Sequence, residues 1–274
     1  LGSKSMGLRC LEAIYDSVPD SLVGVQTVDD SDDTRSVLPS FIAFCDERGI
    51  PLTIVRKKAE SEAHLRATDF DLAFLCGWYW IISQSVLGKP SLGLFGLHNS
   101  LLPAYIGAAP IVWAMLNREP VIGASVYALV DDVDCGDIYA QTSVEVSSAD
   151  YIGDVLERLE EQCVGMVREV YPQLLSGSAQ PTPQRLAHAT YGCRRTPDHG
   201  RIQWTWPAEY VYDFIRAQSK PYPGAFTHYA GTRMTLWRAS LFEPTWYGTP
   251  GQIARVSKAG VHVVCGDNRA IVLE

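Results

Sequence analysis

The chain has 274 residues, of which 47% are hydrophobic and 20% charged, a composition typical of a globular protein with a sizeable core. No apolar run approaches the roughly 20 residues that a helix needs to span a bilayer, so a membrane protein is not expected. The 23 basic and 31 acidic residues give a net charge of −8, which disfavours a protein whose main task is to hold a nucleic-acid backbone.

The seven cysteines are scattered, odd in number and never spaced as C-x-x-C. A disulfide framework and a structural zinc site are therefore not expected, and no metal is predicted, because the histidines show no ligand spacing either. This usage favours a reducing, cytoplasmic compartment, and no export signal is recognised. The abrupt start at Leu1, without a methionine, favours a first strand that ends near this residue and begins before it.

Hydrophobic periodicity predicts alternating helices and strands over the first part of the chain. In chain order the expected elements are a helix over residues 5–18, a strand over 22–28, a helix over 38–48 that ends at Gly49, and strands over 52–55, 71–76 and 92–98 with short helices between them. Such alternation is typical of the α/β class, with an open and mostly parallel sheet.

The next elements are a helix over residues 110–117, strands over 123–130 and 138–144, and a long helix over 150–175 whose apolar residues share one face. Residues 176–183 (SGSAQPTP) have the composition of a linker, and short strands with turn residues follow. We therefore expect a first domain over residues 1–178, a linker over 179–204 and a small, mainly β domain over 205–274.

The strongest candidates for catalytic residues lie at the end of the strand that finishes at His98 and in the segment that follows it. In an open α/β sheet the ligand crevice lies at the carboxyl ends of the strands, which is where a catalytic histidine is expected. Pro103, Gly107 and Pro110 give the next loop a defined shape. Asp134 lies in an acidic turn, and an aspartate beside a histidine lets the ring accept a proton or donate to an oxyanion. By spacing alone, however, His98 also fits a core residue and Asp134 a turn residue.

A longer motif decides between these interpretations. The order H-x-S-L-L-P-x-x-x-G-x-x-P from His98 to Pro110, followed by D-x-G-D from Asp134 to Asp137, resembles the signature of formyltransferases that use 10-formyltetrahydrofolate. Residues 70–79 (FDLAFLCGWY) and several segments between 183 and 226 are also similar to methionyl-tRNA and sugar formyltransferases. The resemblance implies a Rossmann-like formyltransferase domain and an OB-like C-terminal β domain.

The resemblance also implies an activity, which is direct transfer of a formyl group from 10-formyltetrahydrofolate to a primary amine. His98 would stabilise the oxyanion or take the amine proton, and Asp134 would orient His98. The residues expected to line the folate are Cys76, Gly77, Trp78, Tyr79, Val130, Asp131, Asp132 and Asp137. Those expected on the amine side are Asn99, Ser100, Leu101, Leu102, Pro103, Gly107 and Trp113.

Gly96 departs from the family pattern, which is usually N-x-H-x-S-L-L-P. The asparagine that it replaces donates to the oxyanion, and loss of one such donor costs about 3–4 kcal/mol in a well-studied analogous case. Asn99 is a poor substitute, because its side chain points to the opposite face of an extended segment from that of His98. Ser100, a backbone N–H or a water remain alternatives. We expect an active site built around glycine, and an inactivated folate-binding regulatory protein is the contrasting hypothesis.

The sequence favours some classes of acceptor amine over others, but it does not identify the acceptor. The turn over residues 104–107 (AYIG) has no basic residue, and the loop over 29–33 (DDSDD) would repel tRNA. The segment around Trp113 resembles the sugar formyltransferases more than the tRNA enzyme. A nucleotide-linked amino sugar is therefore the first hypothesis for the acceptor. Residues 202–209 and 247–251 also resemble enzymes that formylate hydroxyornithine in siderophore assembly, and methionyl-tRNA is the remaining alternative. The expected partner is thus a small-molecule amine, and the C-terminal aromatic residues hint at a homodimer surface.

Overall fold

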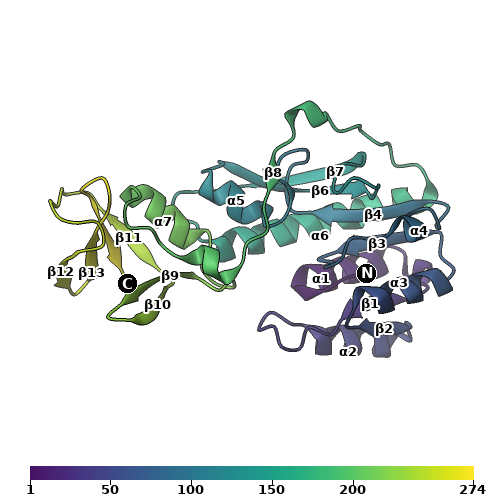
Figure 1. Ribbon diagram of the computed structural model, residues 1–274. Helices are drawn as coiled ribbons and strands as arrows, with labels where there is room; N and C mark the ends of the chain where they lie inside the picture. Colours follow the sequence, from purple (N-terminus) through teal and green to yellow (C-terminus); the bar gives the residue numbers. More distant parts are fainter. The chain divides into compact units, whose positions relative to one another are not determined.

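The computed structural model describes residues 1–274, which form two compact units (Figure 1). The first unit comprises residues 1–107, 123–144 and 158–191, and the second comprises 108–122, 145–157 and 192–274. Four elements contribute residues to both: β6 (Val121–Ala128), β7 (Ile138–Glu145), α6 (Ile152–Ser176) and β8 (Tyr191–Gly192). The division into independent domains at residues 178 and 205 stays a prediction.

The first unit is built from alternating helices and strands. Besides β6 and α6 its elements are α1 (Lys4–Ser17), β1 (Val25–Val28), α2 (Leu38–Arg48), β2 (Leu52–Val55), α3 (Lys58–Ala67), β3 (Leu72–Cys76), α4 (Gln84–Leu87), β4 (Gly93–His98), β5 (Ile106–Gly107), β7 (Ile138–Glu145) and β8 (Tyr191–Gly192), the last two ending in the second unit. Helices and strands therefore follow one another as the periodicity predicts.

The strands of this unit form two main sheets, β1–β2 and β3–β4–β6–β7. β1 pairs with β2, and β3 with β4, in parallel, whereas β4 and β6 are antiparallel. Leu1 and Gly2 lie between the sheets, since the Gly2 N–H donates to the Gln26 carbonyl and the Cys76 N–H to the Leu1 carbonyl. The α/β class is confirmed, although β6 makes the sheet mixed rather than parallel throughout.

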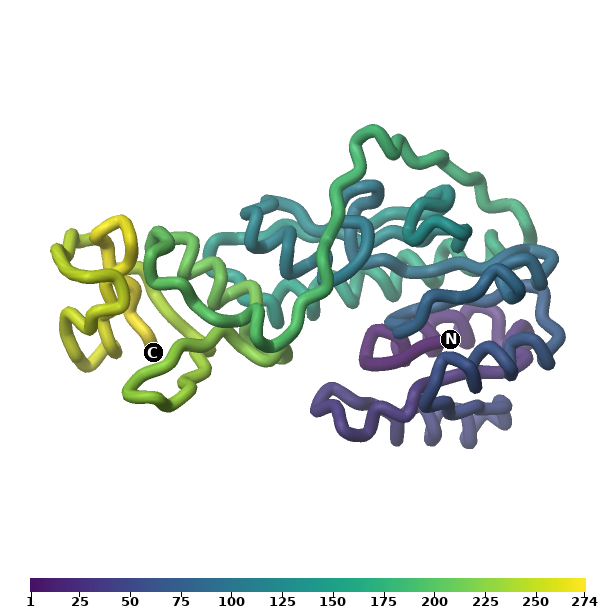
Figure 2. The backbone as a smooth tube through the Cα atoms, viewed as in Figure 1, coloured from purple at the N-terminus to yellow at the C-terminus, as the bar shows by residue number.

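Helix α6 supplies much of the core of the first unit. Its residues Leu159, Cys163 and Val167 are fully buried, as the one-sided apolar pattern predicts. No helix of the chain is both long enough and apolar enough to cross a membrane. After α6 the extended segment 177–190, green in Figure 2, is held to the sheet region by a bridge between Thr182 and Ile138 and by the Ile106 N–H, which donates to the Thr190 carbonyl.

The second unit is mainly β beyond residue 217. Its elements are α5 (Pro110–Leu116), α7 (Ala208–Arg216), β9 (Ala225–Tyr229), β10 (Thr232–Leu236), β11 (Ala239–Phe242), β12 (Ile253–Ser257), β13 (Gly260–Val264) and β14 (Ala270–Leu273). β9 and β10 form a hairpin, and the other four strands form an antiparallel sheet in the order β11–β14–β13–β12. The small C-terminal β domain is thus confirmed, with the addition of α7, whose buried Val211, Phe214 and Ile215 recur at helical spacing.

Candidate active site

His98 is the last residue of β4, and it meets Asp134 at the carboxyl end of this strand. The interior residues Leu94 and Phe95 of this strand are buried, which is typical of a strand covered on both faces. The His98 side chain is itself buried, and its Nδ1 lies 3.4 Å from Asp134 Oδ2. The two residues that the motif singles out are therefore brought together.

Two groups hold the Asp134 carboxylate in addition to His98, and a third holds its backbone carbonyl. The Tyr127 hydroxyl donates to Oδ1 at 2.6 Å, and the Gly107 N–H donates to Oδ2 at 2.9 Å. The backbone of Asp134 is left-handed, with φ of 56°, and the Gln184 side-chain amide donates to its carbonyl at 2.8 Å. Because a left-handed aspartate is uncommon, these contacts indicate a turn whose geometry is imposed by its surroundings.

The imidazole of His98 faces a hydrogen-bond acceptor at each nitrogen. Its Nε2 lies 2.9 Å from the Tyr105 carbonyl oxygen, and its Nδ1 faces Asp134. A neutral imidazole has one N–H, so only the doubly protonated ring donates to both acceptors at once. Because the Tyr105 carbonyl only accepts, a neutral ring donates to it through Nε2–H, and Nε2 has a free lone pair only when this carbonyl is displaced and the proton lies on Nδ1, toward Asp134.

Gly96 lies beside Tyr127, its partner in the β4–β6 register. A Cβ atom built on Gly96 would lie 2.8 Å from Leu129 Cδ1 and 3.0 Å from Tyr127 Cε1. The Tyr127 side chain is buried, and burial together with the Asp134 carboxylate raises the pKa of its hydroxyl above the usual range. The space of the family asparagine is thus filled in part by a tyrosine that stays a hydrogen-bond donor.

The two loops expected to hold the folate are joined directly. The Gln84 side-chain amide, at the start of α4, donates to Asp131 Oδ2 at 2.8 Å. Both loops expose large apolar side chains, with Tyr79 and Ile81 on one and Val130 and Val133 on the other. Trp78 has a buried indole N–H without a hydrogen-bond partner. Apolar surface with an unused donor suits a flat heteroaromatic ring.

Other residues of these loops are held within the protein. The Cys76 carbonyl accepts from the Ser3 N–H, and the Gly77 carbonyl accepts from the Ser3 hydroxyl. The Cys76 thiol is buried, with its sulfur 3.6 Å from that of Cys10. The Asp137 carbonyl accepts from Ala128, and Asp132 lies exposed in the turn. The roles of these residues toward folate stay predictions, and the carbonyl groups of Cys76, Gly77 and Asp137 already have partners.

The residues expected on the amine side form the loop after β4. The Ser100 hydroxyl donates to the Ala104 carbonyl, Leu102 is buried, and the peptide between Leu102 and Pro103 is cis. Leu101 packs within 3 Å of where a Cβ on Gly123 would lie. These residues shape the loop, whereas Asn99 has a buried side-chain oxygen without a partner.

Trp113 and the neighbouring arginines belong to the second unit. The Trp113 indole N–H donates to the Cys193 carbonyl at 2.9 Å, and the Arg195 guanidinium lies 4.9 Å from the centre of its ring. Arg195 also donates to Gln218 Oε1 at 2.6 Å, and burial lowers its pKa. The Arg195 guanidinium therefore packs against Trp113 and Gln218 within this unit. A role of Trp113 toward the amine stays a prediction.

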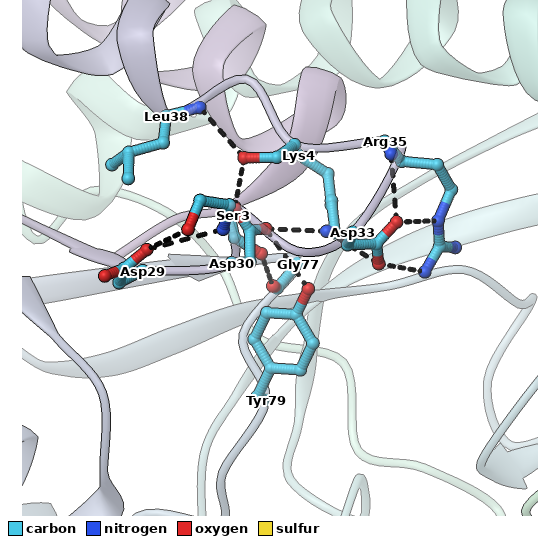
Figure 3. A network of polar contacts seen from close by, with 11 residues as sticks. Ser3, Lys4, Asp29, Asp30, Asp33, Arg35, Leu38, Gly77 and Tyr79 are labelled. Atoms are coloured by element: carbon cyan, nitrogen blue, oxygen red, sulfur yellow. Dashed lines mark hydrogen bonds and ion pairs between the residues drawn. The ribbon is translucent and has the colours of Figure 1, made fainter.

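The acidic loop over residues 29–37 is largely neutralised by nearby cations (Figure 3). Lys4 Nζ lies 2.6 Å from Asp30 Oδ2 and 2.8 Å from Asp33 Oδ2. Arg35 also pairs with Asp33, at 2.7 Å, while Asp29 pairs with Arg56 at the same distance. The tRNA argument drawn from four aspartates is therefore weaker than the sequence implies. No group of three or more histidine, cysteine or acidic side chains is placed to hold a metal.

Tyr127, Tyr105 and Gln184 are the residues that sequence reasoning missed. Tyr127 reaches Asp134 through the turn that follows β6, and Tyr105 reaches His98 through the loop that follows β4. Each pair is close in sequence, but neither contact belongs to a motif recognised in the sequence. The only available signal was Gly96 itself, because a glycine within a strand often marks close approach of another group.

Comparison with known proteins identifies the family. The chain matches the formyl transferase model over residues 45–171 and the model of the formyl transferase C-terminal domain over residues 194–274. HypX from Aquifex aeolicus, solved in complex with tetrahydrofolic acid, is 20% identical with a TM-score of 0.64. That match covers 84% of this chain and 40% of HypX, so the chain spans less than half of that protein.

Two further structures match over more of their own length. The N-formyltransferase from Helicobacter canadensis, solved with folinic acid and dTDP-3-aminofucose, is 16% identical with a TM-score of 0.73, covering 100% of this chain and 97% of that one. A 4-N formyltransferase from Francisella tularensis is 20% identical with a TM-score of 0.69, covering 84% and 91%. These likenesses concern the fold, whereas the two family models together match most of the chain, which therefore belongs to the formyl transferase family.

Proposed function

We propose that this protein transfers a formyl group from 10-formyltetrahydrofolate to the primary amine of a nucleotide-linked sugar. The observation that carries the proposal is the contact between His98 and Asp134 at the carboxyl end of β4, within the family motif. The Helicobacter canadensis enzyme, whose fold this chain shares over its whole length, was solved with a dTDP-linked amino sugar. That likeness favours an amino sugar as the acceptor.

The residues present fit the folate. We place it between the loop that follows β3 and the turn over residues 130–137, which Gln84 and Asp131 connect. Tyr79, Val130 and Val133 offer exposed apolar surface there, and Trp78 offers an unused N–H. When bound, 10-formyltetrahydrofolate would supply the formyl group: its carbon gains a bond to the amine nitrogen and loses its bond to the folate nitrogen, which takes up the proton that the amine gives away.

His98 and Asp134 have different roles in the proposed reaction: His98 transfers a proton or donates to the oxyanion, and Asp134 orients His98. Asp134 Oδ2 lies 3.4 Å from Nδ1, so a proton on Nδ1 directed at this carboxylate leaves Nε2 to act. With a lone pair at Nε2 the ring takes the proton that the amine loses, and with a proton there it donates to the developing oxyanion. The Tyr105 carbonyl, which faces Nε2, must give way to substrate before either event. The Asn99 side chain, which has an unpartnered oxygen, is a further polar group of this loop for the acceptor.

The acceptor is tested by offering alternatives side by side. Purified protein with 10-formyltetrahydrofolate is given dTDP- and UDP-linked amino sugars, hydroxyornithine and charged initiator tRNA, and product is followed by mass spectrometry. We expect an amino sugar to be formylated fastest. Faster formylation of hydroxyornithine or tRNA would overturn the choice of amine, and folate binding without any formylated product would support a binding protein instead.

The link between the two loops gives a separate prediction. Gln84→Ala removes the hydrogen bond to Asp131 and is expected to weaken binding of a stable folate analogue roughly three- to tenfold, the value of one hydrogen bond. The measurement is isothermal titration calorimetry. Gln173→Ala is the control, because this glutamine donates to the Glu169 carbonyl on the surface of α6. Equal affinities for wild type and Gln84→Ala would argue against folate binding between these loops.

A further inference from the structure

Tyr127 is a buried polar residue that the family motif does not include. It lies on β6, opposite Gly96, and 8% of its surface is exposed. Its hydroxyl ends on Asp134 Oδ1, and its ring centre lies 6.4 Å from that of His98, with the rings nearly perpendicular. We infer that Tyr127 is a positioning residue for the Asp134–His98 pair, and that Gly96 is glycine because the tyrosine ring needs the space.

The first step of the argument is the volume beside residue 96. Any side chain at Gly96 would begin 3.0 Å from Tyr127 Cε1 and 3.3 Å from its Cζ. The ring cannot withdraw freely, because it is buried in a cluster with Leu102 and Ile106. The second close neighbour, Leu129 Cδ1, is the end of a flexible side chain and can adjust. Tyr127 and a larger residue at position 96 are therefore alternatives for one space.

The second step is the geometry of the carboxylate. Asp134 Oδ2 accepts from the Gly107 N–H and faces His98 Nδ1, while Oδ1 accepts from Tyr127. Donors on both oxygens prevent rotation of the carboxylate about its bond to the Cβ atom. Without the Tyr127 hydroxyl, only the Gly107 N–H and His98 contact the Asp134 carboxylate, and the direction in which it holds the imidazole is less defined. The Tyr127 hydroxyl is protonated at neutral pH in any case, and burial beside the Asp134 carboxylate raises its pKa further.

The third step concerns the consequence for catalysis, which rests on the proposed function. A histidine that is held less firmly spends less time with Nε2 directed at the reacting atoms, which lowers the rate of the chemical step. The Tyr127 hydroxyl donates to Asp134 and is not assigned a contact with substrate. Removal of this hydroxyl is therefore expected to change the affinity for the amine or the folate little. The expected signature is a fall in kcat at constant KM.

The test uses Tyr127→Phe, which keeps the ring and removes the hydroxyl. Its kcat is expected to fall about tenfold, with KM for both substrates within about twofold of wild type. In the Asp134→Ala background the same change is expected to have no further effect, because the carboxylate on which it acts is gone. Tyr171→Phe is the control, since Tyr171 is also buried in the first unit and its hydroxyl lies 3.3 Å from Ser21 Oγ. Equal, additive losses in both backgrounds would overturn the inference.

A second readout does not depend on activity. In folate-free protein labelled with ¹⁵N-histidine, the His98 ring nitrogens are assigned by their loss in His98→Ala. We expect Tyr127→Phe to shift these resonances and Tyr171→Phe to leave them in place. Unchanged His98 resonances in Tyr127→Phe would refute the positioning role. If wild type formylates no amine, the proposed function fails, and the resonances still decide whether Tyr127 positions His98 through Asp134.

Discussion

His98→Ala is expected to lower turnover at least about a hundredfold, the effect of removing a positioned proton acceptor or oxyanion donor. The ring stands at the end of β4 with Nδ1 directed at Asp134, and no other titratable side chain of this strand can replace it. Asp134→Ala is expected to cause a loss of the same order, because it leaves the imidazole without its partner. Steady-state kinetics with the best amine from the substrate panel measures both.

Folate affinity separates a catalytic effect from a structural one. Neither His98 nor Asp134 carries the apolar surface that we assign to folate binding, so both variants are expected to bind a folate analogue within about threefold of wild type. His64→Ala provides the control for histidine removal, since His64 lies on α3 and contacts Thr53 and Thr68. If His98→Ala keeps wild-type turnover, the assigned mechanism is wrong.

Gly96→Asn, which restores the family residue, is expected to reduce activity rather than raise it. The Cβ atom alone would meet Leu129 and Tyr127 at 2.8 and 3.0 Å, and the amide beyond it needs space that the tyrosine ring occupies. Overpacking of this kind typically costs about 1–3 kcal/mol of stability. Displacement of Tyr127 would also take its hydroxyl away from Asp134. We expect turnover to fall at least about tenfold and the melting temperature to fall with it.

A second substitution tests whether the Tyr127 ring and a side chain at position 96 compete for the same space. Tyr127→Ala removes the obstructing ring, and we expect Gly96→Asn to cost less stability in the Tyr127→Ala background than in the wild type, as measured by urea unfolding of all four proteins. Gly165→Asn is the matched control, because nothing lies within 4 Å of a Cβ at that position of α6. Activity of Gly96→Asn above that of wild type would mean instead that Gly96 is a lesion in an ordinary family site.

Local signals made much of the first unit predictable. The helix over residues 38–48 and the strand over 52–55 were expected with the observed bounds, because Gly49, with φ of 65°, ends the helix and Pro51 precedes the strand. The antiparallel course of β6 differs from the mostly parallel sheet that the alternation of helices and strands predicts. Helix α7 was missed because linker composition and turn residues dominate the sequence around it.

The site was predictable as far as the family motif extends. His98 and Asp134 are named by that motif, and their contact needed the structure to show it. Tyr127 and Tyr105 contact these two residues through the paths of a turn and a loop, which the spacing alone does not define. The structure also gives the absence of asparagine at position 96 a physical cause, because Tyr127 fills part of that space.

The ion pairs of the acidic loop bear on how a charged substrate reaches the protein. Lys4, Arg35 and Arg56 cancel most of the charge that the loop's aspartates would otherwise project into solvent. A field built from such close pairs decays within a few ångströms, whereas an unpaired cluster acts over a Debye length of about 8 Å at physiological salt. A negatively charged nucleotide-sugar would therefore approach this loop without strong repulsion. Its association rate would change only modestly with ionic strength.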